Sequence, residues 1–286
     1  MTLVMTILAR DEGDILRENL LFHLESGVDH IIVTDNLSVD ATPDIIDEFA
    51  RQGVVTPLRE DGDDFRQGEW VTRMARMAAA RHGADWVINS DADEFWIPRA
   101  GGSLAQALGA LPFWRSTAQA WHHDFVCIED PALPFHERML WRKRRTTIPH
   151  DRPAPPKYAH RGWRWVTVVD GNHEVRHGRP GRVAGDVLDI LHFTMRSPER
   201  YRRKILRGGE AFLRNPDLPE SVGFTWRRQY EELLATNALR FVEESRYDLA
   251  RAEAAVATGE LVRDTRVRDR LRRLTGPGTP DAAVGA

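Results

Sequence analysis

The sequence has little of what several classes of protein require. Its 286 residues include one cysteine, Cys127, so the chain cannot form an intrachain disulfide. No apolar run is long enough to span a bilayer. Lys and Arg number 40 against 43 Asp and Glu, a formal net charge of −3, which argues against a general nucleic-acid-binding protein. Residues 1–9 are apolar but lack the basic start and cleavage site of a signal peptide, so we expect a cytoplasmic protein without a transmembrane segment.

Several catalytic motifs are also missing. The chain has no Gly-x-x-x-x-Gly-Lys-Ser/Thr loop, no Gly-x-Gly-x-x-Gly and no Gly-x-Ser-x-Gly, and the last absence argues against an α/β-hydrolase. His122, His123 and Asp124 stand together, but no His-Glu-x-x-His motif or cysteine pair accompanies them to indicate zinc.

What is present is organised around residues 86–96, Trp-Val-Ile-Asn-Ser-Asp-Ala-Asp-Glu-Phe-Trp. The apolar start predicts a buried strand, and Asp91, Asp93 and Glu94 follow where that strand ends. Carboxylates at such a place are costly unless a cation pairs with them. Oxygen ligands suit Mg²⁺ or Mn²⁺, above all when phosphate oxygens complete the shell. The alternative is a solvated turn, but the carboxyl end of a strand is where open α/β sheets bind ligands.

The segments before residue 91 alternate between two periodicities. Strands are expected at 2–9, 30–34, 54–58 and 86–90, with helices between them. Such alternation predicts an α/β fold with a mostly parallel sheet flanked by helices, and the helical segments are too long for an antiparallel sandwich. Beyond residue 98 we expect strands at 118–128, 163–169 and 187–192, an irregular segment at 131–156, and helices at 103–111, 197–213, 231–244, 248–257 and 263–274.

The turn at residues 34–42, Thr-Asp-Asn-Leu-Ser-Val-Asp-Ala-Thr, is expected at the same edge of the sheet as the acidic motif. Asp35 stands just past its strand, where an acid can accept hydrogen bonds from a base or a ribose. It can equally be part of a polar turn that satisfies its own backbone.

Three stretches taken together resemble the family 2 glycosyltransferases of the GT-A fold. They are Thr6-Ile-Leu-Ala-Arg-Asp-Glu12, the turn at 34–42, and Asn89-Ser-Asp-Ala-Asp-Glu94. The chain is most similar to the bacterial branch with an Asp-x-Asp-Glu-Phe motif, itself similar to the family 92 type. In the family the turn reads Asp-Asp-Gly-Ser-x-Asp-x-Thr, whereas Thr34 here replaces the first acid and Asn36 the glycine. The resemblance covers residues 2–113, and more loosely the chain to about 210.

The resemblance implies a mixed, Rossmann-like GT-A domain over 1–213, with a nucleotide-sugar-binding half at 1–113 and an acceptor-binding half at 114–213. Residues 214–286 would be a helical C-terminal extension. It also implies a hexosyltransferase-type enzyme (EC 2.4) that uses a UDP- or GDP-sugar and Mn²⁺ or Mg²⁺. The residues it assigns to the donor are Ala9, Arg10, Glu12, Asp35, Gln67, Arg73 and Asp91. Asp93 would hold the metal against the diphosphate, with Asp91 as a further metal ligand.

Residues 190–204, Ile-Leu-His-Phe-Thr-Met-Arg-Ser-Pro-Glu-Arg-Tyr-Arg-Arg-Lys, resemble the His-x-x-x-Lys/Arg-Ser-x-Glu-x-Phe-x-x-Lys pattern of the same branch. His192 is therefore a third candidate metal ligand. Arg196 and Lys204 would clamp the diphosphate, helped by the helix that begins at Ser197. The alternative is a structural histidine beside a solvated basic helix face.

An inverting enzyme also needs a group that takes the proton of the acceptor. Asp124 is the first candidate, and Glu137 and Glu174 are the others, although each can equally be a structural hydrogen-bonding group. The acceptor itself, whether a glycan, a lipid-linked glycan or a small molecule, is not indicated. Two other functions stay open. A sugar nucleotidyltransferase would need a glycine-rich, lysine-bearing loop that residues 9–13 do not supply, and a non-catalytic nucleotide- or carbohydrate-binding protein would bind without metal dependence.

Overall fold

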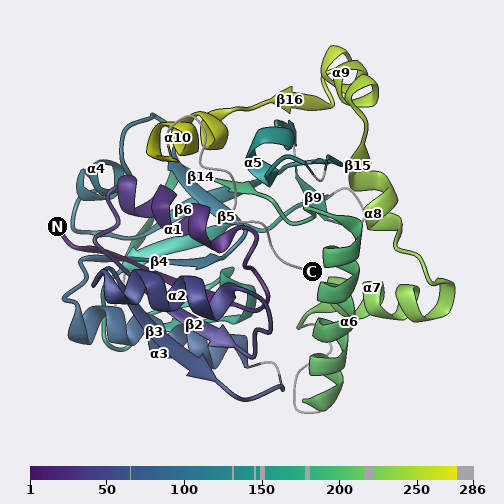
Figure 1. Ribbon diagram of the computed structural model, residues 1–286. Coiled ribbons are helices and arrows are strands. Elements are labelled where there is room, and N and C mark those ends of the chain that lie inside the picture. Colours follow the sequence, from purple (N-terminus) through teal and green to yellow (C-terminus); the bar gives the residue numbers. More distant parts are fainter. Residues whose placement is uncertain are drawn as a thin grey trace.

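The computed structural model describes residues 1–64, 66–130, 132–144, 146–148, 152–177, 181–215 and 222–275. Within these residues an eight-stranded sheet runs in the order β3-β2-β1-β4-β11-β6-β14-β5, and β11 and β5 run opposite to the other strands. Helices flank this sheet (Figure 1). The predicted α/β class, with a mixed and mostly parallel sheet flanked by helices, is confirmed.

The elements fall into three groups. The strands of the large sheet are β1 (Leu3–Ala9), β2 (His30–Asn36), β3 (Val55–Glu60), β4 (Trp86–Asp91), β5 (Glu94–Pro98), β6 (Arg115–Asp124), β11 (Lys157–Arg161) and β14 (Arg182–His192). The helices are α1 (Leu16–Glu25), α2 (Thr42–Arg51), α3 (Gln67–Arg81), α4 (Leu104–Gly109), α5 (Phe135–Arg138), α6 (Pro198–Arg214), α7 (Phe224–Thr236), α8 (Arg240–Ser245), α9 (Leu249–Ala257) and α10 (Arg266–Thr275), with the 3-10 turn η2 (Asp170–Asn172). Short strands form the pairs β7 (Cys127–Ile128) with β15 (Arg246–Tyr247), β8 (Trp141–Lys143) with β16 (Leu261–Arg263), β9 (Thr147–Ile148) with β10 (Arg152–Pro153), and β12 (Thr167–Val168) with β13 (Val175–Arg176).

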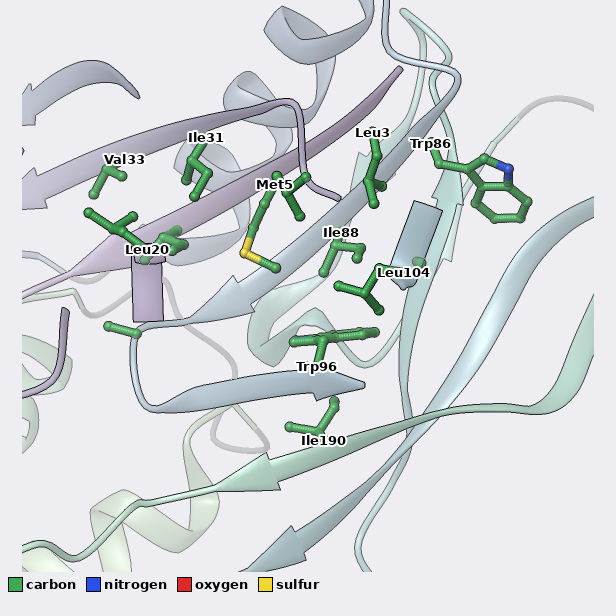
Figure 2. Packing of buried hydrophobic residues seen from close by; sticks show 14 of the residues in the cluster. Leu3, Met5, Leu20, Ile31, Val33, Trp86, Ile88, Trp96, Leu104 and Ile190 are labelled. Carbon is green, nitrogen blue, oxygen red and sulfur yellow. The ribbon is translucent and has the colours of Figure 1, made fainter. Parts of the chain in front are cut away.

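Alternate side chains of each central strand enter different cores, because successive residues of a strand point to opposite faces. Met5 and Ile88 belong to the cluster that contains Leu20 of α1 and Leu104 of α4 (Figure 2). Val4, next to Met5, belongs instead to the cluster formed by α3. Burying each such side chain stabilises the fold by about 1.5–3 kcal/mol, so the two layers hold the central strands in place from both sides.

The second half departs from the sequence-based expectation in four places. The helix expected at 231–244 is two helices, α7 and α8. The irregular segment expected at 131–156 contains α5, β8 and the β9-β10 pair. The strand expected at 163–169 is only the two-residue β12, and the strand that enters the sheet is β11, at Lys157–Arg161. The expected strand at 118–128 is split, because β6 ends at Asp124 and β7 begins at Cys127. The positions of these strands depend on the strands with which they pair, and β11 pairs with β4 and β6. Local hydrophobic periodicity does not encode such pairing.

The elements after residue 214 return to the rest of the chain. β15 pairs with β7 and β16 pairs with β8. Val267 and Leu271 of α10 share a core with Phe22 of α1 and Phe135 of α5. The predicted domain boundary at residue 213 stays a prediction. The described residues after it pack on the earlier part of the chain. In the described part of the chain, no helix combines the length and apolarity that crossing a membrane requires.

Candidate active site

One edge of the sheet collects the polar ends of its strands. The strands β1, β2, β4, β6 and β14 end there, and β5 and β11 begin there because they run the other way. Leu8 pairs with both Thr34 and Asp91, so the second-strand turn and the acidic motif are neighbours, as expected. The residues that the strands bring to this edge are Ala9, Asp35, Asp91, Glu94, Asp124, Lys157 and His192.

Hydrogen bonds from α1 and from the residue after β14 hold the backbone of the turn between β4 and β5. The Asn19 side-chain amide of α1 donates to the carbonyl oxygens of Ala92 at 2.9 Å and Glu94 at 2.8 Å. The backbone N–H of Phe193 donates to the carbonyl oxygen of Asp93 at 2.9 Å. Since the backbone on both sides of Asp93 is held, its carboxylate is presented in one direction.

Asp93 is 2% exposed and is surrounded by cations. Its carboxylate lies 2.9 Å from Lys204 Nζ, 3.6 Å from His192 Nε2 and 3.8 Å from Arg196 Nη1. Burial alone would raise the pKa of Asp93, but Lys204, His192 and Arg196 outweigh it and hold that pKa well below its usual range. Asp93 is therefore an anion that the fold has surrounded with compensating charge.

His192 bridges two carboxylates. Its Nδ1 lies 2.8 Å from Asp124 Oδ1, and its Nε2 faces Asp93. The strand register explains this, because Glu94 pairs with His192 across β5 and β14, and His192 pairs with Asp124 across β14 and β6. Burial opposes protonation, but the two carboxylates raise the pKa of His192 to about 10. The two carboxylates thus favour the imidazolium form of His192, whose Nδ1 contacts Asp124 while Nε2 faces Asp93 at ion-pair distance.

A second cluster lies beside the first and is centred on Lys157. Its ammonium lies 2.7 Å from Asp91 Oδ2 and 2.6 Å from Glu94 Oε1, and Lys157 is 2% exposed. His122 Nε2 lies 2.9 Å from the same Glu94 oxygen. Burial raises the pKa of Asp91, as do the neighbouring carboxylates, although Lys157 opposes the shift. Sequence reasoning missed Lys157, because it directly follows two prolines at the end of the segment predicted to be irregular and no motif marks it.

The third feature is a row of cations along α6. Ser197 caps the helix by accepting from the Arg200 backbone N–H, and Pro198 occupies its first turn. This places Arg200, Lys204 and Arg207 on one face, since residues four and three apart stack on a helix. Arg200 pairs with Asp14, Lys204 with Glu12 at 3.0 Å, and Arg207 with Asp11.

Arg196 completes this row just before the helix. It is 5% exposed, pairs with Glu12, and lies 2.8 Å from Asp14. Burial opposes its charge, but Asp14 and Glu12 raise the pKa of Arg196. Acidic residues of the loop 11–14 thus form ion pairs with Arg196 and Lys204, the two cations that the resemblance assigned to a diphosphate.

The predicted nucleotide residues lie at the end of β2 and the start of α3. Asp35 is buried, and Arg59 Nη1 donates to its Oδ2 at 3.1 Å, while its Oδ1 has no hydrogen-bond partner within the described residues. Gln67 Nε2 lies 3.5 Å from Asp91 Oδ1, and Gln67 Oε1 accepts from the Gly171 N–H at 3.2 Å. A hollow of about 500 Å³ between β3 and α3 is lined by Glu60, Gly62, Asp64, Arg66, Glu69, Trp70 and Arg73, and neither Asp35 nor Gln67 lines it.

The remaining predicted residues take up other contacts. Arg10 Nη1 pairs with Asp63 at 2.6 Å, and Arg73 pairs with Glu60. Asp124 is committed to His192, whose positive charge lowers the pKa of Asp124 against the effect of burial. Glu174 is half exposed and pairs with Arg176 at 2.6 Å. The structure therefore brings Glu12, Asp91, Asp93, Asp124, His192, Arg196 and Lys204 together, and leaves the Glu174 carboxylate on an outer surface pair.

A divalent ion can be tested against these donors. Among the described residues, no group of three or more His, Cys, Asp or Glu side chains is arranged to hold a metal ion. However, Asp93 Oδ1 and His192 Nε2 are 3.6 Å apart, and Mg²⁺ is commonly bound by one or two carboxylates with substrate phosphates completing its shell. The donors thus fit an ion shared with a phosphate ligand, and His192 would have to release its proton to join them.

Comparison with known proteins gives structural likenesses only. No protein-family model matches the chain, and no curated protein matches it either. The crystal structure of S. aureus TarS 1–349 is 11% identical, with a TM-score of 0.41 over 81% of this chain and 77% of that one. TarS 1–349 in complex with UDP gives 11% identity and a TM-score of 0.38 over 82% and 71%. Glucosyl-3-phosphoglycerate synthase from Mycobacterium tuberculosis, in complex with Mn²⁺, UDP and glucosyl-3-phosphoglycerate, gives 17% identity and a TM-score of 0.30 over 42% and 44%. Likenesses of this size leave the function to be argued from the side chains of this chain.

Proposed function

We propose that this protein is a metal-dependent glycosyltransferase of the hexosyltransferase type that moves a sugar from a UDP- or GDP-sugar to an acceptor. The observation that carries the proposal is the buried carboxylate of Asp93, held between Lys204, Arg196 and His192 at the carboxyl edge of the sheet. One site then offers an anion for a divalent ion and cations for a diphosphate.

The cations suit the charge that such a reaction develops. A departing nucleoside diphosphate gains negative charge, and fixed positive groups stabilise it without reorganising. Lys204 and Arg196 already hold carboxylate oxygens of Glu12 and Asp14, and phosphate oxygens would make the same charge-assisted hydrogen bonds. We infer that the diphosphate takes over these contacts when the donor binds.

The metal would be held by Asp93, with Asp91 and His192 as its other candidate ligands, and it would supply Lewis-acid stabilisation of the diphosphate. Lys157 has a separate task, because it keeps Asp91 and Glu94 compensated in a buried place. The charged partners of Asp93 are His192, Arg196 and Lys204, and all three belong to the segment that we assign to the metal and the diphosphate.

The nucleoside is assigned to the hollow between β3 and α3. Asp35 pairs in register with Arg59, next to Glu60 of that hollow, and its buried Oδ1 has no partner among the described residues. A carboxylate oxygen can accept from the N–H of a base or from a ribose hydroxyl. Ala9 is the last residue of β1 and Arg10 follows it, and Gln67 and Arg73 belong to α3. Asp91, at the end of β4, would face the ribose.

The acceptor proton is assigned to Asp124 first and Glu174 second. Asp124 lies at the same edge as Asp93, but its carboxylate is engaged with His192. It could accept a proton only in competition with that imidazolium. Glu174 has the opposite character, because its carboxylate is open to solvent and held by a surface arginine.

The test is a thermal-shift titration of the full chain with UDP or GDP, each with and without Mn²⁺. A ligand that binds only the folded state raises the melting temperature by mass action. We expect UDP or GDP to raise it only when Mn²⁺ is present, and Asp93→Asn to remove the metal-dependent part. Glu253→Gln is the matched control, since Glu253 is an exposed acid on α9. An unchanged response of Asp93→Asn to nucleotide with Mn²⁺ would refute the metal assignment.

Catalysis is separated from mere binding by the fate of the donor. Incubation with UDP-glucose and Mn²⁺, with free UDP measured over hours, should show slow release that Asp93→Asn loses. Binding of UDP without any release from a panel of UDP- and GDP-sugars, with or without offered acceptors, would indicate a non-catalytic binding protein instead.

A further inference from the structure

The edge of the sheet opposite the candidate active site carries an unusual surface. It is formed by the loop after α4, the end of β11 with the residues that follow it, and the start of β14. Phe113 is 84% exposed and Trp114 is 53% exposed, and Trp165 and Val183 are about half exposed as well. Single exposed apolar residues are ordinary, but several gathered in one place mark an interaction site.

Hydrogen bonds show that these segments lie together. The Arg182 backbone N–H donates to the carbonyl oxygen of Trp114 at 3.1 Å. Arg161 Nη2 donates to the carbonyl oxygens of Leu111 at 3.0 Å and Pro112 at 3.1 Å. The rings of Phe113 and Trp114 meet edge to face with centroids 5.2 Å apart. These contacts join residues 111–117 to Arg161 and to Arg182, and residues 162–168 directly follow Arg161 in the chain. We call the segments 111–117, 161–168 and 181–185 the aromatic–arginine patch.

The three segments of this patch carry charge of one sign, although Asp85 lies close to Arg161. Its segments read Leu-Pro-Phe-Trp-Arg-Ser-Thr, Arg-Gly-Trp-Arg-Trp-Val-Thr-Val and Gly-Arg-Val-Ala-Gly, and they contain no Asp or Glu. The four arginines are Arg115, Arg161, Arg164 and Arg182, and none of them forms an ion pair within the described part of the chain. Arg164 and Arg182 are exposed. This contrasts with the α6 row, where the arginines are paired with acids.

We propose that the aromatic–arginine patch docks the protein on an anionic membrane surface. Tryptophan and phenylalanine in an exposed loop can enter the boundary between headgroups and acyl chains, and arginines beside them pair with lipid phosphates. Each arginine near an anionic leaflet adds attraction that salt weakens. An acidic protein partner would meet the arginines equally well, but a membrane is favoured because Phe113 and Trp114 are exposed beside each other, as an interfacial aromatic anchor requires.

The patch and the candidate active site are at opposite ends of β6. The strand runs from Arg115 in the patch to Asp124 at the catalytic edge, about 30 Å at 3.3 Å per residue. Docking would therefore leave the catalytic edge open to solvent. It also means that changes in the patch should leave the response to nucleotide and Mn²⁺ intact, which separates this proposal from the proposed function.

The test is co-sedimentation of the full chain with vesicles of phosphatidylcholine alone or with 30% phosphatidylserine. We expect binding to the anionic vesicles, weakened at least fivefold by 0.5 M NaCl. The double variants Phe113→Ser with Trp114→Ser, and Arg164→Gln with Arg182→Gln, should each lower binding at least fivefold. Leu234→Ser is the matched control, because Leu234 is an exposed apolar residue on α7.

Three results would overturn the proposal. They are absence of binding to the anionic vesicles, equal loss in the Leu234→Ser control, and a parent protein that self-associates in sedimentation equilibrium while the Phe113 and Trp114 double variant is monomeric. The last result would assign the patch to a second copy of the chain. An unchanged melting temperature of the variants shows in each case that the fold is kept.

Discussion

Replacing Lys157 with methionine tests the charge balance that shapes the acidic turn. Lys157 is 2% exposed, and its ammonium contacts Asp91 and Glu94 at 2.7 and 2.6 Å. Methionine fills a similar volume but carries no charge. The variant therefore keeps the buried carboxylate of Glu94 and the partly exposed carboxylate of Asp91, and it removes the cation that compensates them.

The size of the effect follows from the two carboxylates. Breaking one partner of a buried ion pair typically costs about 3–5 kcal/mol. Glu94 is 1% exposed and carries most of this cost, whereas the Asp91 side chain is about a third exposed and can be hydrated. His122 remains 2.9 Å from Glu94 and can compensate part of the charge. We therefore expect the lower end, a loss of about 3 kcal/mol in the free energy of unfolding measured by urea denaturation.

A second variant decides whether the loss comes from the unpaired charge. Lys157→Met combined with Glu94→Gln removes both charges, so we expect it to be at least about 1 kcal/mol more stable than Lys157→Met alone. The reasoning is refuted if Lys157→Met costs less than about 1 kcal/mol, or if adding Glu94→Gln makes it still less stable. Either result would mean that Lys157 is not the compensating charge of the turn.

Two further predictions concern α1. His23 is buried, accepts from the Trp96 N–H through Nε2 and contacts the Asn19 carbonyl oxygen through Nδ1, and its burial lowers its pKa to about 3. Because the unfolded chain takes up this proton near pH 6.5 and the folded chain does not, the stability is full above pH 6.5 and is lost as the pH falls. Between pH 7 and pH 5 the free energy of unfolding should fall by about 2 kcal/mol, and by less in His23→Gln. An equal pH dependence of the two proteins would contradict this. Asn19→Ala leaves the carbonyl oxygens of Ala92 and Glu94 without their donor, so it should cost about 2–3 kcal/mol in urea denaturation, and a loss below 0.5 kcal/mol would show that the turn does not depend on Asn19.

The first ninety residues were predictable because their signals are local. Strands and helices alternate with clear periodicity, and the carboxyl ends of parallel strands must share an edge. The sequence alone therefore brings Ala9, Asp35 and Asp91 together, and the register agrees. The second half was harder. β11 has five residues and β5 follows β4 after a two-residue turn, so their places depend on β4, β6 and β14, which lie far away in the chain or run in the opposite direction.

The charge pairing of the site was not predictable from the same patterns. For His192 and the arginines near it, the sequence allowed a ligand role or a solvated helix face. The structure shows a third arrangement, because Arg196 and Lys204 are paired with Glu12 in the loop after β1, some 190 residues earlier in the chain. A motif search finds each partner alone, but only the closed sheet brings the two segments together.

This pairing says something that stability alone does not. A buried ion pair gains little over well-packed apolar residues of similar volume, because desolvation offsets the attraction between the charges. Arg196, Glu12, Asp93 and Glu94 are each nearly fully buried at one edge of the sheet, beside an apolar core that the same strands form with leucine, isoleucine and valine. A fold that needed only stability could use those residues at the edge too. The pairs of Arg196 with Glu12 and Asp93 are therefore consistent with the proposed function, in which a charged ligand exchanges with them.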